Sequence, residues 1–146
     1  MEKDLDHYDY NLPEKLPNVL GIGWLSEKRP FLKGDVSDAF LEKLKYLIER
    51  ESVNQMRGTH QCPFCDLHDV VLETNSREIV LGSAEVWVPK SGSSVVYGAP
   101  NLIYHYILDH KYKPPDCFIE AVEGFDCDSD WSGEESYAEA LDVLYP

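Results

Sequence analysis

The distribution of apolar residues predicts a surface helix in the first third of the chain. Apolar side chains recur there with the spacing of one face of an α-helix. They are Phe40, Leu41, Leu44, Leu47 and Ile48. Asp35 and Ser37 precede this stripe and are suitable N-caps, so we expect a helix over residues 36–50.

The pattern changes to that of β-strands in the middle of the chain. Runs rich in Val, Ile and Leu are separated by turn residues at 75–76 and 89–93. The runs cover residues 70–72, 79–88 and 95–97. Their order and short connections predict a three-stranded antiparallel meander, and Gly82 marks a possible bulge in its second strand.

Proline and capping residues indicate two further helices. Pro100 suits the first turn of a helix that runs through His110, and the pair at 114–115 must terminate it. An S-x-x-E capping box that begins at Ser132 starts a last helix. The apolar face of that helix consists of Tyr137, Ala138, Leu141 and Leu144.

Together these elements predict an α+β fold in which helices flank the meander. We expect a single domain over residues 1–146, because the chain has no internal repeat and no low-complexity linker. The apolar segment 21–25 is expected to be a buried loop or short strand with Trp24 in the core. The parts of the domain are an N-terminal arm (1–20), a core (21–122) and an acidic C-terminal segment with a short helix (123–146).

The charge of the chain restricts its partners. There are 27 acidic and 13 basic side chains, which gives a net charge of −14. Residues 123–146 hold eight of the acids and no Lys or Arg, so this segment carries −8 and the remainder −6. A field of this sign repels phosphate backbones and attracts cations. We therefore expect a basic protein partner and no nucleic acid, although acidity that only confers solubility is the alternative.

The sequence also predicts a cytoplasmic location and no membrane partner. No apolar run approaches the roughly 20 residues that span a bilayer, and the N-terminus lacks the apolar stretch of a secretory signal. In a reducing compartment, a Cys-x2-Cys pair is more often a metal or redox site than a disulfide. Cys62 and Cys65 form such a pair.

Four residues are candidate ligands of one structural Zn²⁺. Cys62 and Cys65 supply two ligands, and a tetrahedral structural site needs four. His105 and His110 form an H-x4-H pair on the helix that follows the predicted meander, within the H-x3–5-H spacing of Cys2His2 sites. The sequence thus predicts a zinc-finger-like site that joins the Cys turn to this helix.

The spacing of the histidines leaves the ligand set open. Residues five apart on a regular helix point about 140° away from each other, so both imidazoles reach one ion only if the helix loosens near its end. If the helix stays regular, His60 or Cys117 replaces one histidine. Cys127 is expected to be an exposed thiol in an acidic loop, and neither it nor Cys117 is assigned a role.

Two other interpretations of the Cys pair remain. Thioredoxin-like redox chemistry places C-x-x-C after a strand and at the start of a helix, whereas this pair precedes a sheet. Ordinary reduced cysteines are the second alternative.

No catalytic residue is predicted, because four protein ligands leave no position on the metal for water. The strongest enzyme alternative is a metal-dependent hydrolase or nuclease of the ββα-metal type, with His60 or His68 as general base. The negative charge and the lack of a basic groove argue against it. The sequence also lacks a phosphate-binding Gly-rich loop, a nucleophile elbow and an H-E-x-x-H motif.

The motifs as a set resemble an uncharacterised family of small bacterial proteins, a domain of unknown function. The resemblance spans about residues 20–122. It rests on GWL at 23–25, RGTHQCPFC at 57–65, LGSAEV at 81–86, YGAPNLIYHYI at 97–107 and PP at 114–115. It implies a shared fold and a shared Cys/His site, and it brings no activity or catalytic residues.

These observations favour a small acidic, zinc-stabilised domain that binds a basic protein. One function of this kind is that of an immunity or antitoxin protein, because complementary charge speeds the capture of a cationic toxin. The alternatives are the metal-dependent hydrolase and a structural domain without such a partner.

Overall fold

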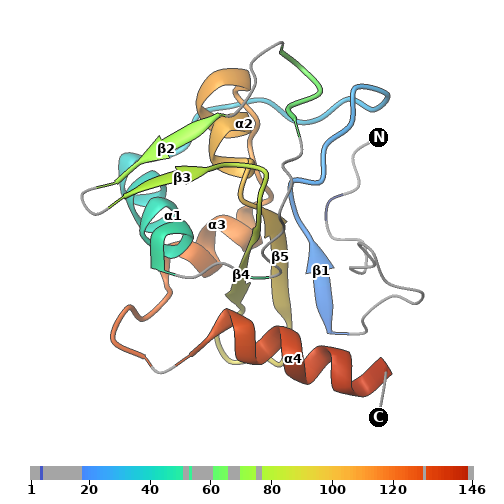
Figure 1. The fold of residues 1–146 in the computed structure, drawn as a ribbon, viewed down its shortest axis with the longest axis vertical. Helices are drawn as coiled ribbons and strands as arrows, with labels where there is room; N and C mark the ends of the chain where they lie inside the picture. The colour runs from blue at the N-terminus through green and yellow to red at the C-terminus, as the bar shows by residue number, and fades with distance from the viewer. Residues whose placement is uncertain are drawn as a thin grey trace.

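The computed structural model describes residues 4, 18–50, 53, 61–65, 70–74, 77–129 and 131–144. This part of the chain has the predicted α+β composition (Figure 1). The strands are β1 (Val19–Gly21), β2 (Val71–Glu73), β3 (Glu78–Val80), β4 (Glu85–Pro89) and β5 (Val96–Pro100). The helices are α1 (Asp38–Arg50), α2 (Ile103–His110), α3 (Asp116–Glu123) and α4 (Gly133–Leu144).

The central sheet has three strands in the order β1-β5-β4. β4 and β5 form an antiparallel hairpin whose register runs from Glu85 opposite Pro100 to Pro89 opposite Val96. β1 pairs with the other edge of β5 in parallel, with Val19 opposite Val96. The sheet is therefore mixed, and its middle strand comes last in the sequence.

The predicted three-stranded meander is wrong in its arrangement, although its strands exist. β2 and β3 pair with each other in a separate two-stranded sheet. The run expected as one strand over 79–88 is interrupted by a turn at 81–84. Gly82 lies in this turn with φ of +95°, a backbone conformation that glycine adopts without steric cost. It ends the pairing of β3 instead of forming a bulge within a continuous strand.

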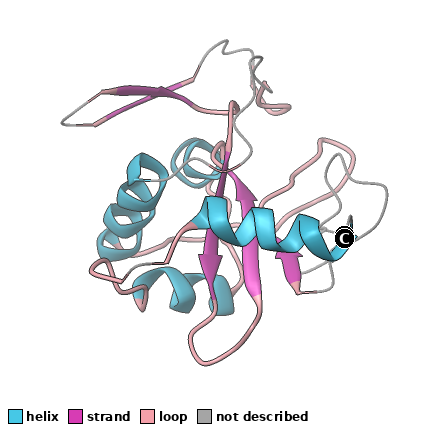
Figure 2. Cartoon of the chain, turned by 60° about the horizontal axis from the view of Figure 1, so that its bottom comes forward, coloured by secondary structure: helices cyan, strands magenta, loops and turns pink. Residues whose placement is uncertain are grey.

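Helices cover both faces of the central sheet (Figures 1 and 2). Val86 and Val88 of β4 join the main core with residues of α1, α2 and α3. Trp87, between them, points to the other face and packs edge-on against Tyr137 of α4, with ring centroids 5.2 Å apart. This alternation is the period of two expected for a strand buried on both sides.

α1 confirms the helix expected from the apolar stripe. Phe40, Leu44, Leu47 and Ile48 are buried, and the Ser37 hydroxyl accepts a hydrogen bond of 3.1 Å from the Phe40 backbone N–H. This is the contact of an N-cap side chain with the third residue of a helix.

α2 and α3 differ from the expectation of one helix starting at Pro100 and ended by the proline pair. Pro100 closes strand β5, and α2 begins three residues later. α2 ends at His110, before the prolines. Pro115 instead occupies the N-cap position of α3, a helix that was not predicted from the sequence. Proline is suited to the start of a helix because it lacks the N–H that would be unpaired there.

α4 starts at the predicted capping box. The Ser132 hydroxyl accepts a hydrogen bond of 3.3 Å from the Glu135 backbone N–H. Trp131, Tyr137 and Ala140 pack around buried Trp87 and Val53, while Glu134, Glu135 and Glu139 are exposed. The helix thus docks one face and presents acids on the other.

The N-terminal arm is described only at Asp4 and from residue 18 onward. The Asp4 carboxylate accepts hydrogen bonds from the backbone N–H of Gly23 at 2.8 Å and from the Tyr112 hydroxyl at 2.5 Å. Asp4 thus packs against the loop after β1 and against Tyr112, which follows α2. The predicted turn at 75–76 lies outside the described residues. None of the described helices is long and apolar enough to cross a bilayer.

Gly133 offers a test of how α4 docks. A Cβ atom at this position would lie 2.7 Å from Val53 Cγ2, whereas alanine ordinarily stabilises a helix relative to glycine. We expect Gly133→Ala to lower the free energy of unfolding by about 1–3 kcal/mol, because the clash outweighs propensity. Chemical denaturation measures this change. Glu139→Ala, on the exposed face of the same helix, should be nearly neutral; a stabilising Gly133→Ala would contradict the docking.

Candidate metal centre

The two thiols of the site lie on a tight turn. Residues 63–65 form this turn, with Cys62 buried and Cys65 half-buried. The Phe64 backbone N–H points at Cys62 Sγ, with an N···S distance of 3.4 Å. Backbone donors aimed at sulfur stabilise a thiolate, which is the form of cysteine that binds metals. The local backbone is therefore arranged for a ligating sulfur.

Both histidines come from α2, and their imidazole rings lie close together. His105 is fully buried in the middle of α2, and His110 is its last residue. Lys111 follows in the left-handed conformation, with φ of 60°, and the backbone N–H of Tyr112 bonds to the carbonyl of Tyr106. The helix is closed off directly after His110. Both histidines lie within the α-helical residues, so the expected loosening between them is not found, yet the two imidazole centroids lie only 5.0 Å apart.

The four side chains converge on one point. Cys62 Sγ is 3.4 Å from His110 Nε2, and Cys65 Sγ is 3.4 Å from His105 Nε2. One ligand atom from each of the four residues lies within 4.8 Å of the others. Tetrahedral zinc with ordinary bond lengths places sulfur and nitrogen ligands about 3.6 Å apart. The donor set and its spacing therefore fit a tetrahedral metal ion.

A family model described as a domain of unknown function, DUF7919, matches residues 1–123. The chain belongs to the DUF7919 family. The match ends close to the predicted boundary at residue 122, and it includes the N-terminal arm, which the sequence resemblance left out. Comparison with curated proteins and with solved structures finds no match.

In this DUF7919 domain, Asp109 supports one of the histidines. Its Oδ2 lies 2.6 Å from His105 Nδ1, which has no well-aligned hydrogen bond to any described group. A carboxylate behind a histidine fixes the tautomer that leaves Nε2 free to bind a metal and makes this nitrogen more basic. The sequence reading missed Asp109, although its i+4 spacing from His105 on a helix is a usable signal.

An aromatic group packs beside the cluster. The Phe64 ring lies between three neighbours, with centroid distances of 5.2 Å to Phe31, 5.5 Å to His110 and 5.8 Å to Tyr106. Tilted and edge-on contacts of this kind are favourable. They cover one side of the cluster, in which Cys62 and His105 are buried and Cys65 and His110 are half-buried. The Cys turn is thus packed against α2 by Phe64 as well as by its sulfur atoms.

Burial sets the protonation state of the donors. It raises the pKa of Cys62 to about 11, and the opposing Phe64 N–H is too weak to offset this. Burial also lowers the pKa of His110, and the neighbouring His105 adds to the effect. At neutral pH without a cation, Cys62 is a neutral thiol and His110 a neutral imidazole. A metal ion could therefore bind the neutral imidazole of His110 directly. Binding to Cys62 would require the thiol to release its proton.

The remaining predicted residues are not part of this cluster. Cys117 lies beside the hydroxyl of Tyr97, and burial together with this thiol raises the pKa of Tyr97 to about 12. Among the described residues, the Cys/His cluster does not include Cys117. Cys127 is half-buried against the core, not exposed as expected. His60 and His68 lie outside the described residues, so their predicted roles stay predictions.

Asp109→Asn tests the support of His105. The amide keeps the shape of the side chain and removes its charge, so we expect metal affinity to fall by at least about tenfold while the fold is retained. Competition with a chromogenic chelator measures the affinity. Asp142→Asn removes the same charge from an exposed position of α4 and should leave the affinity unchanged. Equal affinities for both variants and the wild type would show that Asp109 has no such role.

Proposed function

We propose that this domain binds one Zn²⁺ through Cys62, Cys65, His105 and His110. The convergence of two sulfur and two imidazole nitrogen donors is the observation that carries the proposal. Mixed sulfur and nitrogen ligation in a tetrahedron is characteristic of zinc, whereas magnesium and calcium prefer oxygen donors. Phe64 packs on His110, and two of the four donors, Cys62 and His105, are buried, which suits a permanent constituent of the fold.

The role of the ion is structural in this proposal. Four protein donors complete a tetrahedral sphere, so no position is left for water or a substrate. When bound, the ion would cross-link two segments that are 40 residues apart at Cys65 and His105. Because the unfolded chain has no preformed site, metal binding contributes directly to folding. The ion would hold the Cys turn on α2 and leave the molecule to act through its surface.

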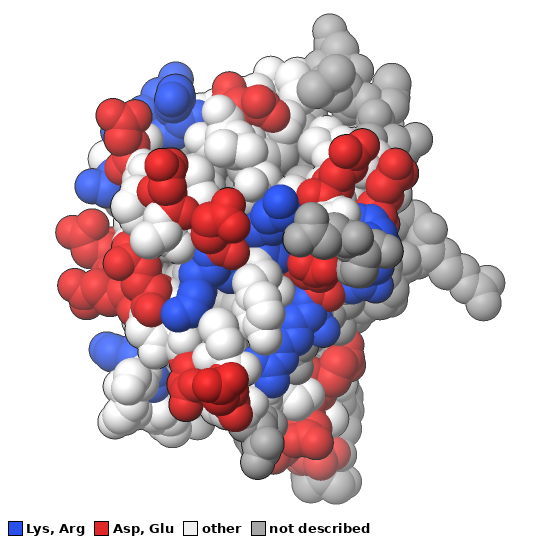
Figure 3. Space-filling view, turned by 90° about the vertical axis from the view of Figure 1, so that its left-hand side faces the viewer, with Lys and Arg blue, Asp and Glu red and all other residues white. Residues whose placement is uncertain are grey.

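We further propose that the acidic surface of the domain binds a basic protein. The basic side chains around α1 do not all pair with these acids, because several of them bond to backbone carbonyls instead. Lys43 Nζ bonds to the carbonyl of Glu123, and Arg50 bonds to those of Cys127 and Ser129. Figure 3 shows this face, where Lys and Arg side chains are interspersed among Asp and Glu. Arg50 thereby holds the acidic segment that leads into α4, and the exposed carboxylates remain available to a partner.

Charge complementarity supports a basic partner. The segment 123–146 contributes −8 of the total charge of −14, and the exposed acids of α4 form its outer face. Complementary fields raise association rates with cationic proteins. A cationic toxin is one protein with the complementary charge. The specific function that we propose is therefore that of an immunity protein, which binds and neutralises such a toxin.

The zinc proposal predicts one equivalent of Zn²⁺ per purified chain. Cys62→Ser should lose the metal, because a serine hydroxyl is a poor zinc ligand. Chelation of the wild type should lower the midpoint of thermal unfolding by about 10 °C or more. Elemental analysis and calorimetry measure both effects. Cys127→Ser, outside the cluster, is the matched control and should keep its zinc. Metal-free protein with an unchanged midpoint would refute the proposal.

The basic-partner proposal predicts that binding depends on α4. A synthetic peptide of alternating Arg and Lys serves as probe, and its affinity should fall at least about tenfold between low and physiological salt. Changing Glu134, Glu135, Glu139 and Asp142 to amides should weaken binding severalfold. The control changes Asp35, Glu42, Glu73 and Glu78, which are also exposed. If both quadruple variants weaken binding equally, the acids of α4 do not form a specific surface.

A further inference from the structure

The two cysteines of the metal centre can also react with each other. Cys62 and Cys65 are both free thiols at one tight turn, and their Sγ atoms lie within 4.8 Å of each other. The sulfur atoms of a disulfide are about 2.05 Å apart, so closing the bond requires only a local movement within this turn. Thioredoxin-like Cys-x-x-Cys pairs form disulfides across the same number of intervening residues. The spacing is therefore compatible with a disulfide.

The two cysteines differ in their access to solvent. Cys62 is 4% exposed, whereas Cys65 is half-buried. A small oxidant in solution therefore meets Cys65 first, and Cys62 is the neighbouring thiol that can resolve the oxidised product. Among the described residues, neither Cys117 nor Cys127 belongs to the cluster. The geometry thus favours a bond within the pair over a bond to another thiol of the chain.

We propose that a peroxide converts Cys62 and Cys65 into a disulfide and thereby releases the zinc ion. The inference rests on the proposed zinc binding and adds a means of regulating it. A metal binds the thiolate form of cysteine, and the sulfur atoms of a disulfide carry no such charge. Only the imidazoles of His105 and His110 would then remain, whereas a structural zinc site uses four donors. Zinc binding and the disulfide therefore exclude each other.

The reaction balances with one hydrogen peroxide for each zinc ion. The Cys65 thiolate attacks one peroxide oxygen, the O–O bond breaks, and the departing hydroxide takes up a proton from solution. The Cys62 thiolate then attacks the sulfur of the Cys65 sulfenic acid, the S–O bond breaks, and a second hydroxide takes up a second proton. The two thiolates have lost two electrons, and the peroxide has become two water molecules. The charge of the two protons equals that of the Zn²⁺ that leaves.

Contacts other than the sulfur atoms keep the turn near α2. Phe64, which lies in the turn, packs against Tyr106 and His110 of α2, with centroid distances of 5.8 Å and 5.5 Å. These contacts do not require a metal ion. We therefore expect oxidation to change the turn locally and to be reversible, because a disulfide returns to two thiols by exchange with a reduced thiol.

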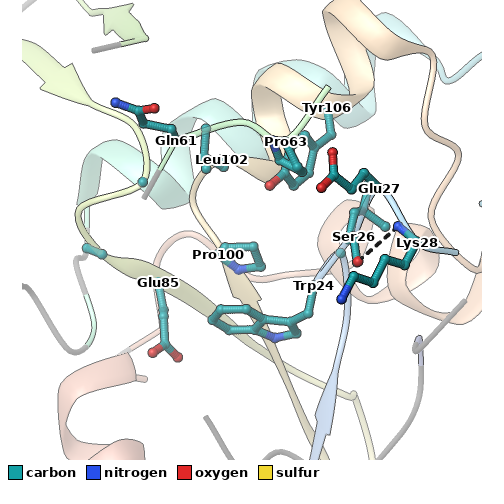
Figure 4. A pocket seen from close by; sticks show the side chains of 14 residues that line it. Trp24, Ser26, Glu27, Lys28, Gln61, Pro63, Glu85, Pro100, Leu102 and Tyr106 are labelled. Atoms are coloured by element: carbon teal, nitrogen blue, oxygen red, sulfur yellow. Dashed lines mark hydrogen bonds between the residues drawn. The ribbon is translucent and has the colours of Figure 1, made fainter. Parts of the chain in front are cut away.

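The Cys turn also forms part of the wall of a cavity of about 390 Å³ (Figure 4). Gln61 and Pro63, which flank Cys62, line this cavity together with Tyr106 of α2. Trp24, which was expected in the core, is instead half-buried and lines the cavity as well. A movement of the turn on oxidation would therefore change the shape of the cavity.

The test treats the zinc-loaded wild type with a slight excess of hydrogen peroxide. A chromogenic chelator follows the release of zinc, and peptide mass spectrometry identifies the bond that forms. We expect one zinc ion to be released for each disulfide between Cys62 and Cys65, at least about tenfold faster than without peroxide. A phosphine reductant followed by zinc should restore the original metal content. A variant with both Cys117→Ser and Cys127→Ser retains only the thiols of the pair and should behave in the same way.

The inference is overturned if zinc leaves without a disulfide between Cys62 and Cys65, or if the product is a sulfinic acid that the reductant does not reverse. Zinc release that requires Cys117 or Cys127 would overturn it as well. Elemental analysis before the peroxide is added separates this inference from the zinc proposal. Protein that holds no zinc refutes both, whereas protein that holds zinc and keeps it in peroxide refutes only the redox control.

Discussion

The structure depends on a geometric constraint at the end of α2. Two imidazoles five residues apart diverge on a regular helix, yet both must face sulfur atoms that come from a single turn. Both histidines nevertheless lie within α2, and their imidazole centroids are 5.0 Å apart, so the side chains themselves span the divergence. The packing of Phe64 against α2 and the position of Asp109 behind His105 follow from the same arrangement. The wall of the neighbouring cavity, which includes Pro63, follows from it as well.

The metal centre and the acidic surface have separate tasks in this account. The cluster joins the Cys turn to the helical side of the sheet, whereas α4 covers the opposite face and carries exposed carboxylates. The cavity lies between these parts, with Pro63 from the Cys turn and Glu85 from β4 among its lining residues. Trp87, two residues after Glu85, packs on Tyr137 of α4.

Local signals predicted much of this structure, and contacts between distant segments account for what they missed. The apolar stripe predicted α1, the capping box predicted the start of α4, and the Cys and His spacings predicted the members of the cluster. The parallel pairing of β1 with β5 joins residues more than 70 positions apart and leaves no local pattern. Gly82 was predicted to form a bulge within one strand, whereas it lies in the turn between β3 and β4; the sequence does not separate the two because both accept glycine. Pro115 was interpreted as the end of a helix, although proline equally suits the start of the next one.

X-ray absorption at the zinc edge of the purified domain tests the central claim most directly. The account predicts two sulfur neighbours at about 2.3 Å and two nitrogen neighbours at about 2.0–2.1 Å, with imidazole scattering beyond them. Replacing both histidines with alanine should abolish the imidazole signal. A zinc ion surrounded only by oxygen and nitrogen atoms, or one with a water ligand in place of a sulfur, would contradict the account.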